Sequence, residues 1–326
     1  MFPVLLILAG GIGLALGFRL GRKRPYPFVR SFMQWSIGVY VGEDFSKLTP
    51  PPEAKNPVLQ ARDVKEFKAE FVADPFLMRK GELWHMFFEA MELKTQRASI
   101  GLAQSRDGFK WEYRQIVLSE PFHLSYPFVF EWEGQVYLIP ETEMQRSVRL
   151  YRAREFPTRW EFVKNLLEGR PFHDPTPFFS GGRWWMFVGL GLACDTLCLF
   201  HADSPLGPWR EHAMNPIHHG NPHSARPGGR VFVSGDRVVR FAQEDCPGYG
   251  RSLRAFEIER LTPTEYKERW IPVRWPIGKE DWNEEGMHHV DLQPLGEGRW
   301  LACMDGQRMI WVLDILNQEA KKEKLR

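Results

Sequence analysis

Short apolar runs separated by turn-forming residues recur along this chain, and their lengths are those of β-strands. Phe71 to Glu89 predicts two strands joined by a tight hairpin at Lys80-Gly81-Glu82. Two further strands, Ala98 to Ala103 and Trp111 to Val117, follow across a turn that contains Asp107-Gly108, a strong hairpin signal. Four strands within about fifty residues predict one antiparallel sheet.

The same unit recurs along the chain. Its markers are Pro-Phe at the first strand, Gly followed by an aromatic residue at the second, and Ala and Trp around the third and fourth. They are Pro75, Pro127 and Pro177; Gly81, Gly134 and Gly182; Ala103, Ala153 and Ala202; and Trp111, Trp160 and Trp209. Successive copies are about fifty residues apart, and two weaker copies follow. This period predicts an all-β, five-bladed β-propeller with one four-stranded antiparallel sheet per blade.

The predicted blades lie near residues 71–118, 123–164, 172–212, 226–270 and 288–316. The fifth copy contains about three clear strands. We therefore expect the isolated strand at 35–42 to close the ring of a propeller domain at 35–316, because radial closure protects sheet edges. A charged tail at 317–326 follows.

The N-terminal residues 1–20 contain an apolar run of seventeen residues, Phe2 to Phe18, and a basic linker at 21–34 follows. This run is at the short end for a membrane span. Positive charge after the run favours a single-pass anchor with the propeller on the cytoplasmic side, since a signal peptide carries its charge before the run. A cleaved, signal-like or interfacial segment is the alternative.

Composition narrows the function classes. The chain has 326 residues, of which 43% are hydrophobic and 14% aromatic, so it can bury a large core. Lys and Arg number 43 against 41 Asp and Glu, which gives no electrostatic case for a nucleic-acid partner. Its four cysteines match no zinc pattern. We expect no cofactor and no required metal, although the carboxylates and histidines described next could hold an ion.

Polar residues occupy equivalent places near the start of each predicted inner strand. In a propeller these places meet at one end of the central channel, and burying a charge there costs several kcal/mol unless it is paired or hydrated. The candidates are Asp74, Tyr126 with His123, Asp174, Arg226, and the fifth-blade residues His288, His289 and Asp291, with Glu89 and Glu141 at the ends of second strands. An Asp before Pro can also simply fix a turn. In the third unit, either Pro175 or Pro177 can be aligned with Pro75.

Several motifs resemble known families. ADPF at Ala73 to Phe76, the turn from Ala103 to Trp111, and ADSPLGPW at Ala202 to Trp209 resemble the five-bladed propeller glycosidases of the arabinanase, xylosidase and invertase type. The strings WSIGVYVG, FVADPF, HLSYPFVFEWEGQVYLIPET, ARPGG and HHVD, within Trp35 to Ile315, are similar to the N-terminal domain of plant glucosamine inositolphosphorylceramide transferase and its bacterial relatives. The resemblance implies a propeller linked to glycan or glycolipid metabolism. The glycosyltransferase domain that follows in the plant protein is not expected here, since the chain ends at Arg326.

The resemblance also implies roles for individual residues. Asp74 matches the first-blade Asp of the glycosidases, which serves as base or nucleophile. Tyr126 stands in place of their second-blade Asp, and their third-blade Glu acid has no counterpart in the same motif, which argues against ordinary glycoside hydrolysis. That reaction needs two carboxyl groups, about 5–5.5 Å apart for retention or about 6.5–9.5 Å apart for inversion. Asp74 with Glu141 or Asp174 is the pair we expect.

Three functions stay open. The first is a membrane-anchored enzyme acting on a glycan, glycolipid or sugar-phosphate, with Asp74 as base and Glu141 or Asp174 as acid. In it Arg226 and His289 would hold an anionic or hydroxyl-rich substrate. The second is a non-catalytic glycan-binding or scaffold propeller that partners a glycosyltransferase, and the third is a structural interaction module. The sequence leans towards the first.

Overall fold

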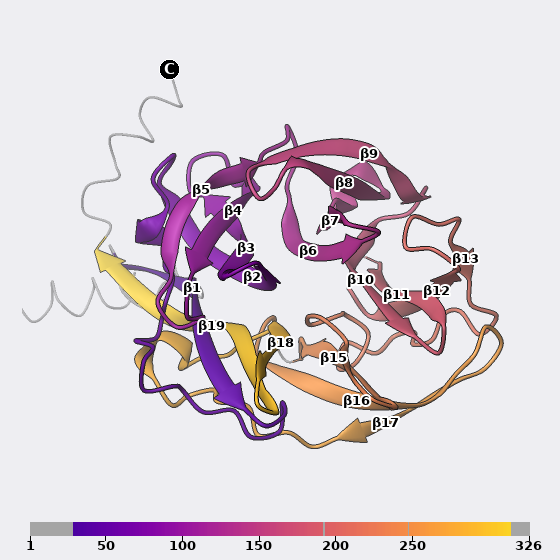
Figure 1. Ribbon diagram of the computed structural model, residues 1–326. Coiled ribbons are helices and arrows are strands. Elements are labelled where there is room, and N and C mark those ends of the chain that lie inside the picture. The colour runs from indigo at the N-terminus through magenta and orange to yellow at the C-terminus, as the bar shows by residue number, and fades with distance from the viewer. Residues whose placement is uncertain (1–28, 192, 247, 314–326) are drawn as a thin grey trace, which may run out of the picture. The chain divides into compact units, whose positions relative to one another are not determined.

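The structure is a computed structural model that describes residues 29–191, 193–246 and 248–313. In this part of the chain 19 strands form five sheets, which confirms the prediction of an all-β propeller. The chain divides into two compact units, one of which is Trp35–Gln307. In that unit the sheets follow one another around a central axis (Figure 1). In the other unit the described residues are Val29–Gln34 and those from Arg308 to Leu313.

Four sheets contain four antiparallel strands each, in chain order. The first is β2 (Ala69–Lys80), β3 (Leu83–Glu92), β4 (Ala98–Ser105) and β5 (Glu112–Leu118). The second is β6 (Ser125–Trp132), β7 (Gln135–Glu141), β8 (Ser147–Glu155) and β9 (Arg159–Glu168). The third is β10 (Phe172–Ser180), β11 (Arg183–Leu190), β12 (Thr196–Ala202) and β13 (Arg210–Glu211), and the fourth is β14 (Phe232–Ser234), β15 (Arg237–Glu244), β16 (Ser252–Leu261) and β17 (Tyr266–Ile271). Three short 3-10 helices, η1 (Ala61–Asp63), η2 (Glu143–Gln145) and η3 (Asp281–Asn283), lie in connections.

The fifth sheet differs from the prediction. Its order is β1 (Val29–Gly42), β19 (Arg299–Leu313), β18 (Val290–Gly296), so three strands are described where four were expected. The strand β19 is one long strand. The edge of β1 that faces away from β19 pairs with an irregular segment instead of with a fourth strand. The side-chain amide of Asn56 takes part in this, since it accepts from the N–H of Val39 and donates to its carbonyl, both at 2.9 Å.

Packing between neighbouring sheets explains why the inner strands are apolar runs and do not alternate. Both faces of β2 are covered, so Val72 to Met78 are all buried. The repeated tryptophans contribute to the same interfaces: the ring of Trp160 on β9 lies 5.5 Å from that of Phe87 on β3, in the neighbouring blade. The core therefore lies between blades and leaves the channel for polar groups.

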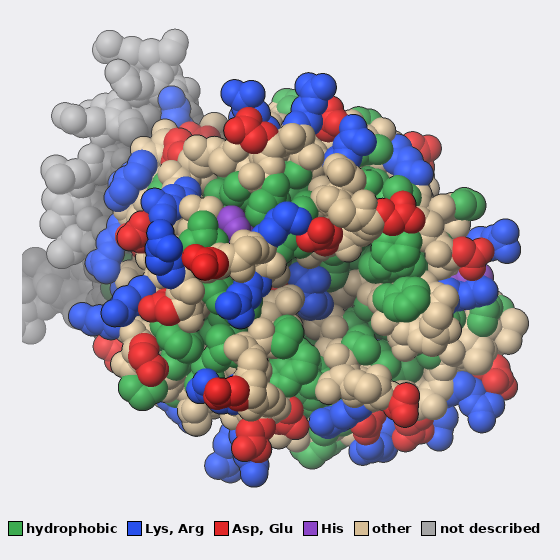
Figure 2. Space-filling model, viewed as in Figure 1, with side chains coloured by type: hydrophobic (Ala, Val, Ile, Leu, Met, Phe, Trp, Pro, Cys, Tyr) green, Lys and Arg blue, Asp and Glu red, His purple; other side chains and the backbone are tan. Residues whose placement is uncertain are grey.

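The centre of the ring is open to solvent on one face. Figure 2 shows this face hollowed in the middle, with basic side chains in the hollow. The hollow is where the inner strands of the five sheets meet.

The predicted membrane anchor at 1–20, most of the basic linker at 21–34 and the tail at 317–326 lie outside the described residues. Among the residues that the structure does describe, there is no helix with the length and apolar character needed to cross a membrane. Anchoring and sidedness therefore stay predictions.

Candidate functional site

Three residues with left-handed backbone conformation mark equivalent positions in the first three inner strands. Asp74, Tyr126 and Asp174 have φ values of 51°, 47° and 48°, and each precedes a proline at a bulge in the pairing with the second strand. Such a φ costs a residue with a side chain about 1–2 kcal/mol, so the surroundings must hold it. This equivalence settles the register of the third unit. Pro175 corresponds to Pro75, and the repeat drawn through Pro177 was displaced by two residues.

The backbone N–H groups of these three residues donate hydrogen bonds to carboxylates of neighbouring sheets. The N–H of Asp74 donates to Asp305 Oδ2 at 3.3 Å, and that of Tyr126 donates to Asp74 Oδ2 at 3.3 Å. The N–H of Asp174 donates to Glu141 Oε2 at 3.1 Å. Carboxylates thus link the fifth sheet to the first, the first to the second, and the second to the third.

Arg226 of the fourth blade completes this chain of contacts. Its Nε donates to Asp174 Oδ2 at 2.6 Å, and Gln243 Nε2 donates to the same oxygen at 3.1 Å. Burial lowers the pKa of Arg226, but the Asp174 carboxylate outweighs burial and raises it well above its usual value. Burial also raises the pKa of Asp174, to about 8, against the effect of Arg226. Because two donors converge on one oxygen of a side chain that is 1% exposed, we describe the pair as ionised.

Glu89 on β3 is a carboxyl group whose pKa is raised by its surroundings. Burial, and then the carboxylates of Asp74, Glu141 and Asp174, raise the pKa of Glu89 well above its usual value. His123 Nε2 lies 3.5 Å from Glu89 Oε1. A carboxyl group with a raised pKa has the property that a general acid needs.

Glu141, at the end of β7, has the opposite character. Burial raises its pKa, but the nearby His173 imidazole and the charge of Arg226 outweigh this and hold the pKa at about 2. His173 Nδ1 lies 3.6 Å from Glu141 Oε2. An anionic Glu141 is suited to act as a base or to stabilise positive charge, and less suited to donate a proton.

His288 adds a side chain of the fifth blade to this group of carboxyl, imidazole and guanidinium side chains at the rim. Its Nδ1 lies 2.6 Å from Asp305 Oδ2 and 3.9 Å from Asp74 Oδ1, and its ring stacks on Trp35 with centroids 4.1 Å apart. Burial lowers the pKa of His288, but Asp305 raises it above its usual value. Ligand atoms of Asp74, His288 and Asp305 lie within 4.8 Å of one another, so these three could hold a divalent cation. The close pairing of His288 with Asp305 also accounts for their arrangement without an ion.

Tyr126, predicted to bind substrate, does not present its side chain to the rim. The residue is 0% exposed. Its hydroxyl contacts Thr176 Oγ1 at 2.8 Å and accepts from the N–H of Gly229 at 2.7 Å. Burial raises the pKa of Tyr126 well above its usual value. The phenol is thus fully engaged inside the channel wall.

His289 and Asp291 are also 0% exposed. His289 Nε2 donates to the carbonyl of Pro75 at 2.9 Å, and Asp291 Oδ1 accepts from Arg230 Nε at 2.7 Å. The structure therefore places these two side chains, like that of Tyr126, in the interior. The predicted residues that it brings together at the rim are Asp74, Glu89, His123, Glu141, Asp174, Arg226 and His288.

Sequence reasoning missed four members of the cluster: His173, Gln243, Tyr249 and Asp305. The repeat offered a signal for Gln243 and Asp305, because Phe241-Ala242-Gln243 and Cys303-Met304-Asp305 both align with Phe87-Phe88-Glu89. Tyr249 lies in an irregular loop, where the residue is 50% exposed and its ring lies 5.2 Å from the guanidinium of Arg226. Repeat alignment cannot find such a residue.

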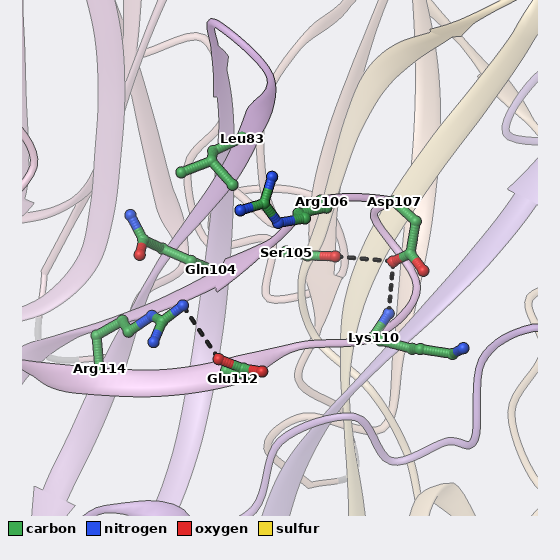
Figure 3. Close-up of a pocket in the computed structure, with 8 residues that line it drawn as sticks. All are labelled: Leu83, Gln104, Ser105, Arg106, Asp107, Lys110, Glu112 and Arg114. Carbon is green, nitrogen blue, oxygen red and sulfur yellow. Dashed lines mark hydrogen bonds and ion pairs between the residues drawn. The ribbon is translucent and has the colours of Figure 1, made fainter.

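A separate pocket of about 290 Å³ lies on the hairpin between β4 and β5, and Figure 3 shows its lining. Arg114 pairs there with Glu112 at 3.0 Å, and Arg106 and Lys110 also line it. It contains none of the rim residues, so the candidate site is the channel rim.

Comparison with known proteins places this geometry in a family. The sequence model described as "Glucosamine inositolphosphorylceramide transferase 1, N-terminal" matches residues 32–307. The chain belongs to this family. Curated relatives of that name are 38% identical over 303 residues in Oryza sativa subsp. japonica and 34% identical over 299 residues in Arabidopsis thaliana. The alignments cover 84% of this chain but 40% and 39% of the relatives, so the chain spans about two fifths of their length.

Solved structures confirm the glycosidase-like propeller fold. A glycosyl hydrolase from Bacteroides ovatus superposes with a TM-score of 0.58 at 12% identity and covers 82% of this chain and 94% of that one. An α-L-arabinanase from Cellvibrio cellulosa superposes with a TM-score of 0.52 at 18% identity, covering 73% and 90%. At these identities the likeness concerns the fold alone.

Proposed function

We propose that this propeller is a carbohydrate-active module that binds a sugar-containing, phosphate-bearing lipid head group at the channel rim. In this proposal Glu89 and Asp74 perform acid/base chemistry at a glycosidic bond. The name of the relatives, glucosamine inositolphosphorylceramide transferase, joins a sugar to a phosphorylated inositol lipid and supports this substrate class.

The observation that carries the proposal is the contrast between two carboxyl groups of one cluster. Glycoside chemistry needs a protonated carboxyl for the leaving oxygen and an ionised one on the other side of the bond. The raised pKa of Glu89 and the low pKa of Glu141 support a separation of these two states between the two carboxyl groups. Asp74 has the position of the base or nucleophile in the glycosidases, whereas Asp174 is held by Arg226 at 2.6 Å.

The accessible part of the rim suits an anionic substrate. The Arg226 side chain is 16% exposed, and the half-exposed ring of Tyr249 lies beside it. A guanidinium binds phosphate oxygens in a bidentate manner. His123, with 26% of its side chain exposed, lies next to Glu89. A phosphate at Arg226 would therefore leave the attached sugar close to the carboxyl pair.

The test is turnover of a panel of glycosides and inositol-phosphate glycolipids by the wild type, Asp74→Asn and Glu89→Gln. We expect each variant to lose about 10²–10⁴-fold in rate, as is usual when a general acid or base is removed. Glu112→Gln, which changes an exposed carboxyl of the same blade, serves as the matched control and keeps full activity. Circular dichroism checks folding. Undiminished turnover in both rim variants would remove this carboxyl pair from the mechanism.

A non-catalytic glycan-binding propeller that partners a glycosyltransferase is the second candidate. The observation that favours it is that Asp174 and Glu141 are engaged by Arg226 and His173, while Tyr126 occupies the second-blade position. Calorimetric titration with the same glycolipids separates the two candidates. Binding without product after long incubation supports the second, and product formation excludes it.

We also propose that residues 1–20 anchor the propeller to a membrane, with the propeller on the cytoplasmic side. The apolar run from Phe2 to Phe18 and the basic residues after it support this. Fractionation and protease protection in intact vesicles test it. Full release of the protein into the supernatant by high salt contradicts the anchor, and digestion of the propeller from outside the cell contradicts the sidedness.

A further inference from the structure

The pocket on the hairpin between β4 and β5 is a cavity that the rim does not use. Its volume is about 290 Å³, at the lower end of the range of about 300–1,000 Å³ for small-molecule sites. Leu83 on β3, Gln104 on β4 and the hairpin residues line it (Figure 3). The pocket therefore has room for a ligand of the size of a single sugar ring, and its lining decides which kind.

Hydrogen bonds to Asp107 hold this hairpin in one conformation. Asp107 Oδ1 accepts from Ser105 Oγ at 2.9 Å. The same oxygen accepts from the N–H groups of Phe109 and Lys110, both at 2.8 Å. Burial raises the pKa of Asp107, but these N–H groups outweigh burial and lower the pKa below its usual value. The neighbouring Arg106 and Lys110 are thus presented from an ordered loop, which reduces the entropy that binding costs.

The charges in the pocket favour an anion. Its lining holds three cations, Arg106, Lys110 and Arg114, and two carboxylates, Asp107 and Glu112. Glu112 lies 3.0 Å from Arg114, and one oxygen of Asp107 is occupied by the hairpin. Within the part of the chain that the structure describes, the side chains of Arg106 and Lys110 form no ion pair. Two free cations, one of them a guanidinium that can bind oxyanions in a bidentate manner, suit a phosphate group.

Neutral groups beside these cations suit hydroxyls and C–H groups. Gln104 lies opposite His85 of β3 and Glu112 of β5, so its side chain shares a face of the sheet with both. Gln104 Nε2 lies 3.1 Å from His85 Nδ1. Burial lowers the pKa of His85 to about 4, so the ring is neutral near pH 7 and its Nδ1 accepts from the amide. This leaves Gln104 Oε1 to accept from a ligand hydroxyl, with Leu83 as an apolar wall.

We propose that this pocket is a second ligand site, which binds a phosphate monoester or diester of a polyol such as an inositol or a sugar. Arg106 and Lys110 bind the phosphate oxygens, Gln104 Oε1 accepts from a ring hydroxyl, and Leu83 contacts the ring. A free phosphorylated polyol and the head group of a phosphoinositol lipid share this chemistry, and the experiment distinguishes these two sources. The proposal does not depend on the proposed function, because the pocket contains no rim residue and its test measures binding instead of turnover.

The experiment is arginine footprinting of the full chain with phenylglyoxal, in which tandem mass spectrometry gives the modification rate of each arginine. The ligand is myo-inositol 1-phosphate. At about ten times the half-saturating concentration the site is free about a tenth of the time, so the rate at Arg106 should fall about tenfold. Arg97, an exposed arginine between β3 and β4 of the same blade, should keep its rate. Arg226 reports on the rim in the same digest, so that the pocket and the rim are judged separately.

Further ligands identify what the pocket recognises and where it comes from. Inorganic phosphate and myo-inositol should each need a concentration at least about tenfold higher to protect Arg106, because each makes only part of the contacts. Vesicles of phosphatidylcholine with phosphatidylinositol are compared with vesicles of phosphatidylcholine alone. Protection by the former at a lower concentration of inositol phosphate groups than the free compound needs assigns the lipid as the source. Protection by the free compound alone assigns a soluble source, and either result supports the proposal.

Variants test the contacts one at a time. Lys110→Met should raise the concentration that half-protects Arg106 about threefold to tenfold, since a charge-assisted contact contributes less at an exposed site than in the interior. Lys94→Met, which changes an exposed lysine of the same blade, should leave it unchanged, and Gln104→Leu should abolish the preference over inorganic phosphate. Myo-inositol 1-phosphate at about 10 mM saturates a site with a Kd of about 1 mM. The proposal is overturned if this concentration protects Arg106 no more than Arg97, if inorganic phosphate protects equally well, or if Lys110→Met leaves the protection intact.

Discussion

Removal of Arg226 tests whether charge pairing holds the rim together. Arg226→Met keeps most of the length and the apolar stem of the side chain, but it leaves Asp174, which is 1% exposed, with Gln243 as its remaining side-chain donor. Loss of one partner of a buried ion pair destabilises a protein by about 3–5 kcal/mol, because the other charge stays buried without compensation. We expect a loss of this size.

This loss converts into a measurable shift. The unit Trp35–Gln307 has about 270 residues, and unfolding entropy near the midpoint is about 2.1 cal/mol/K per residue. A loss of about 3–5 kcal/mol therefore lowers the Tm by about 5–9 °C. Differential scanning calorimetry of the wild type and the variant measures it.

Two comparisons make the result specific to charge. The double variant Arg226→Met/Asp174→Asn is expected to recover most of the lost Tm, since no uncompensated charge remains. Arg106→Met, on the outer hairpin of Figure 3, is expected to change the free energy of unfolding by less than about 0.5 kcal/mol, as surface substitutions usually do. A loss below about 1 kcal/mol for Arg226→Met, or no recovery in the double variant, refutes the reasoning.

Two further predictions concern neighbours of this ion pair. Because folding raises the pKa of Glu89, the stability that this group contributes is complete below its unfolded pKa of about 4.3 and is lost as the pH rises through the folded value. Glu89→Gln is neutral at every pH, so its Tm should gain on that of the wild type between pH 5 and pH 9, and a constant difference contradicts this. Tyr126→Phe removes the acceptor of the buried Gly229 N–H and should lower the free energy of unfolding in urea by about 1–3 kcal/mol; a change below about 0.5 kcal/mol would show that another acceptor replaces the hydroxyl.

The sequence predicted the backbone of the site well and its side chains less well. Equivalent places in the repeat fix where the inner strands turn, so Asp74, Tyr126 and Asp174 do share one conformation. The direction of a side chain depends on what its neighbours supply. The phenol of Tyr126 turns inward to Thr176, where it packs and finds hydrogen bonds, whereas the carboxyl of Asp174 meets Arg226.

Residues outside the period could not be found by alignment. Tyr249 lies in a loop whose course follows from tertiary packing. Charge states were equally hidden, because the pKa of Glu89 depends on three carboxyl groups from other strands of the ring. The separation of residues along the sequence does not reveal this combined effect on a pKa. The fold and the location of the site could be predicted from the repeat, but the division of roles among its carboxyl groups could not.

The pairing of β1 with β19 has a consequence for biosynthesis. The N-terminal part of a chain leaves the ribosome first, so the strands of the first four sheets have been made before β18 and β19. Asp305, which receives the N–H of Asp74 and pairs with His288, lies on that last strand. A nascent chain that stops before Arg299 would lack both the closure of the ring and this carboxylate. The rim is therefore completed last, and the site can be intact only after translation has reached the final blade.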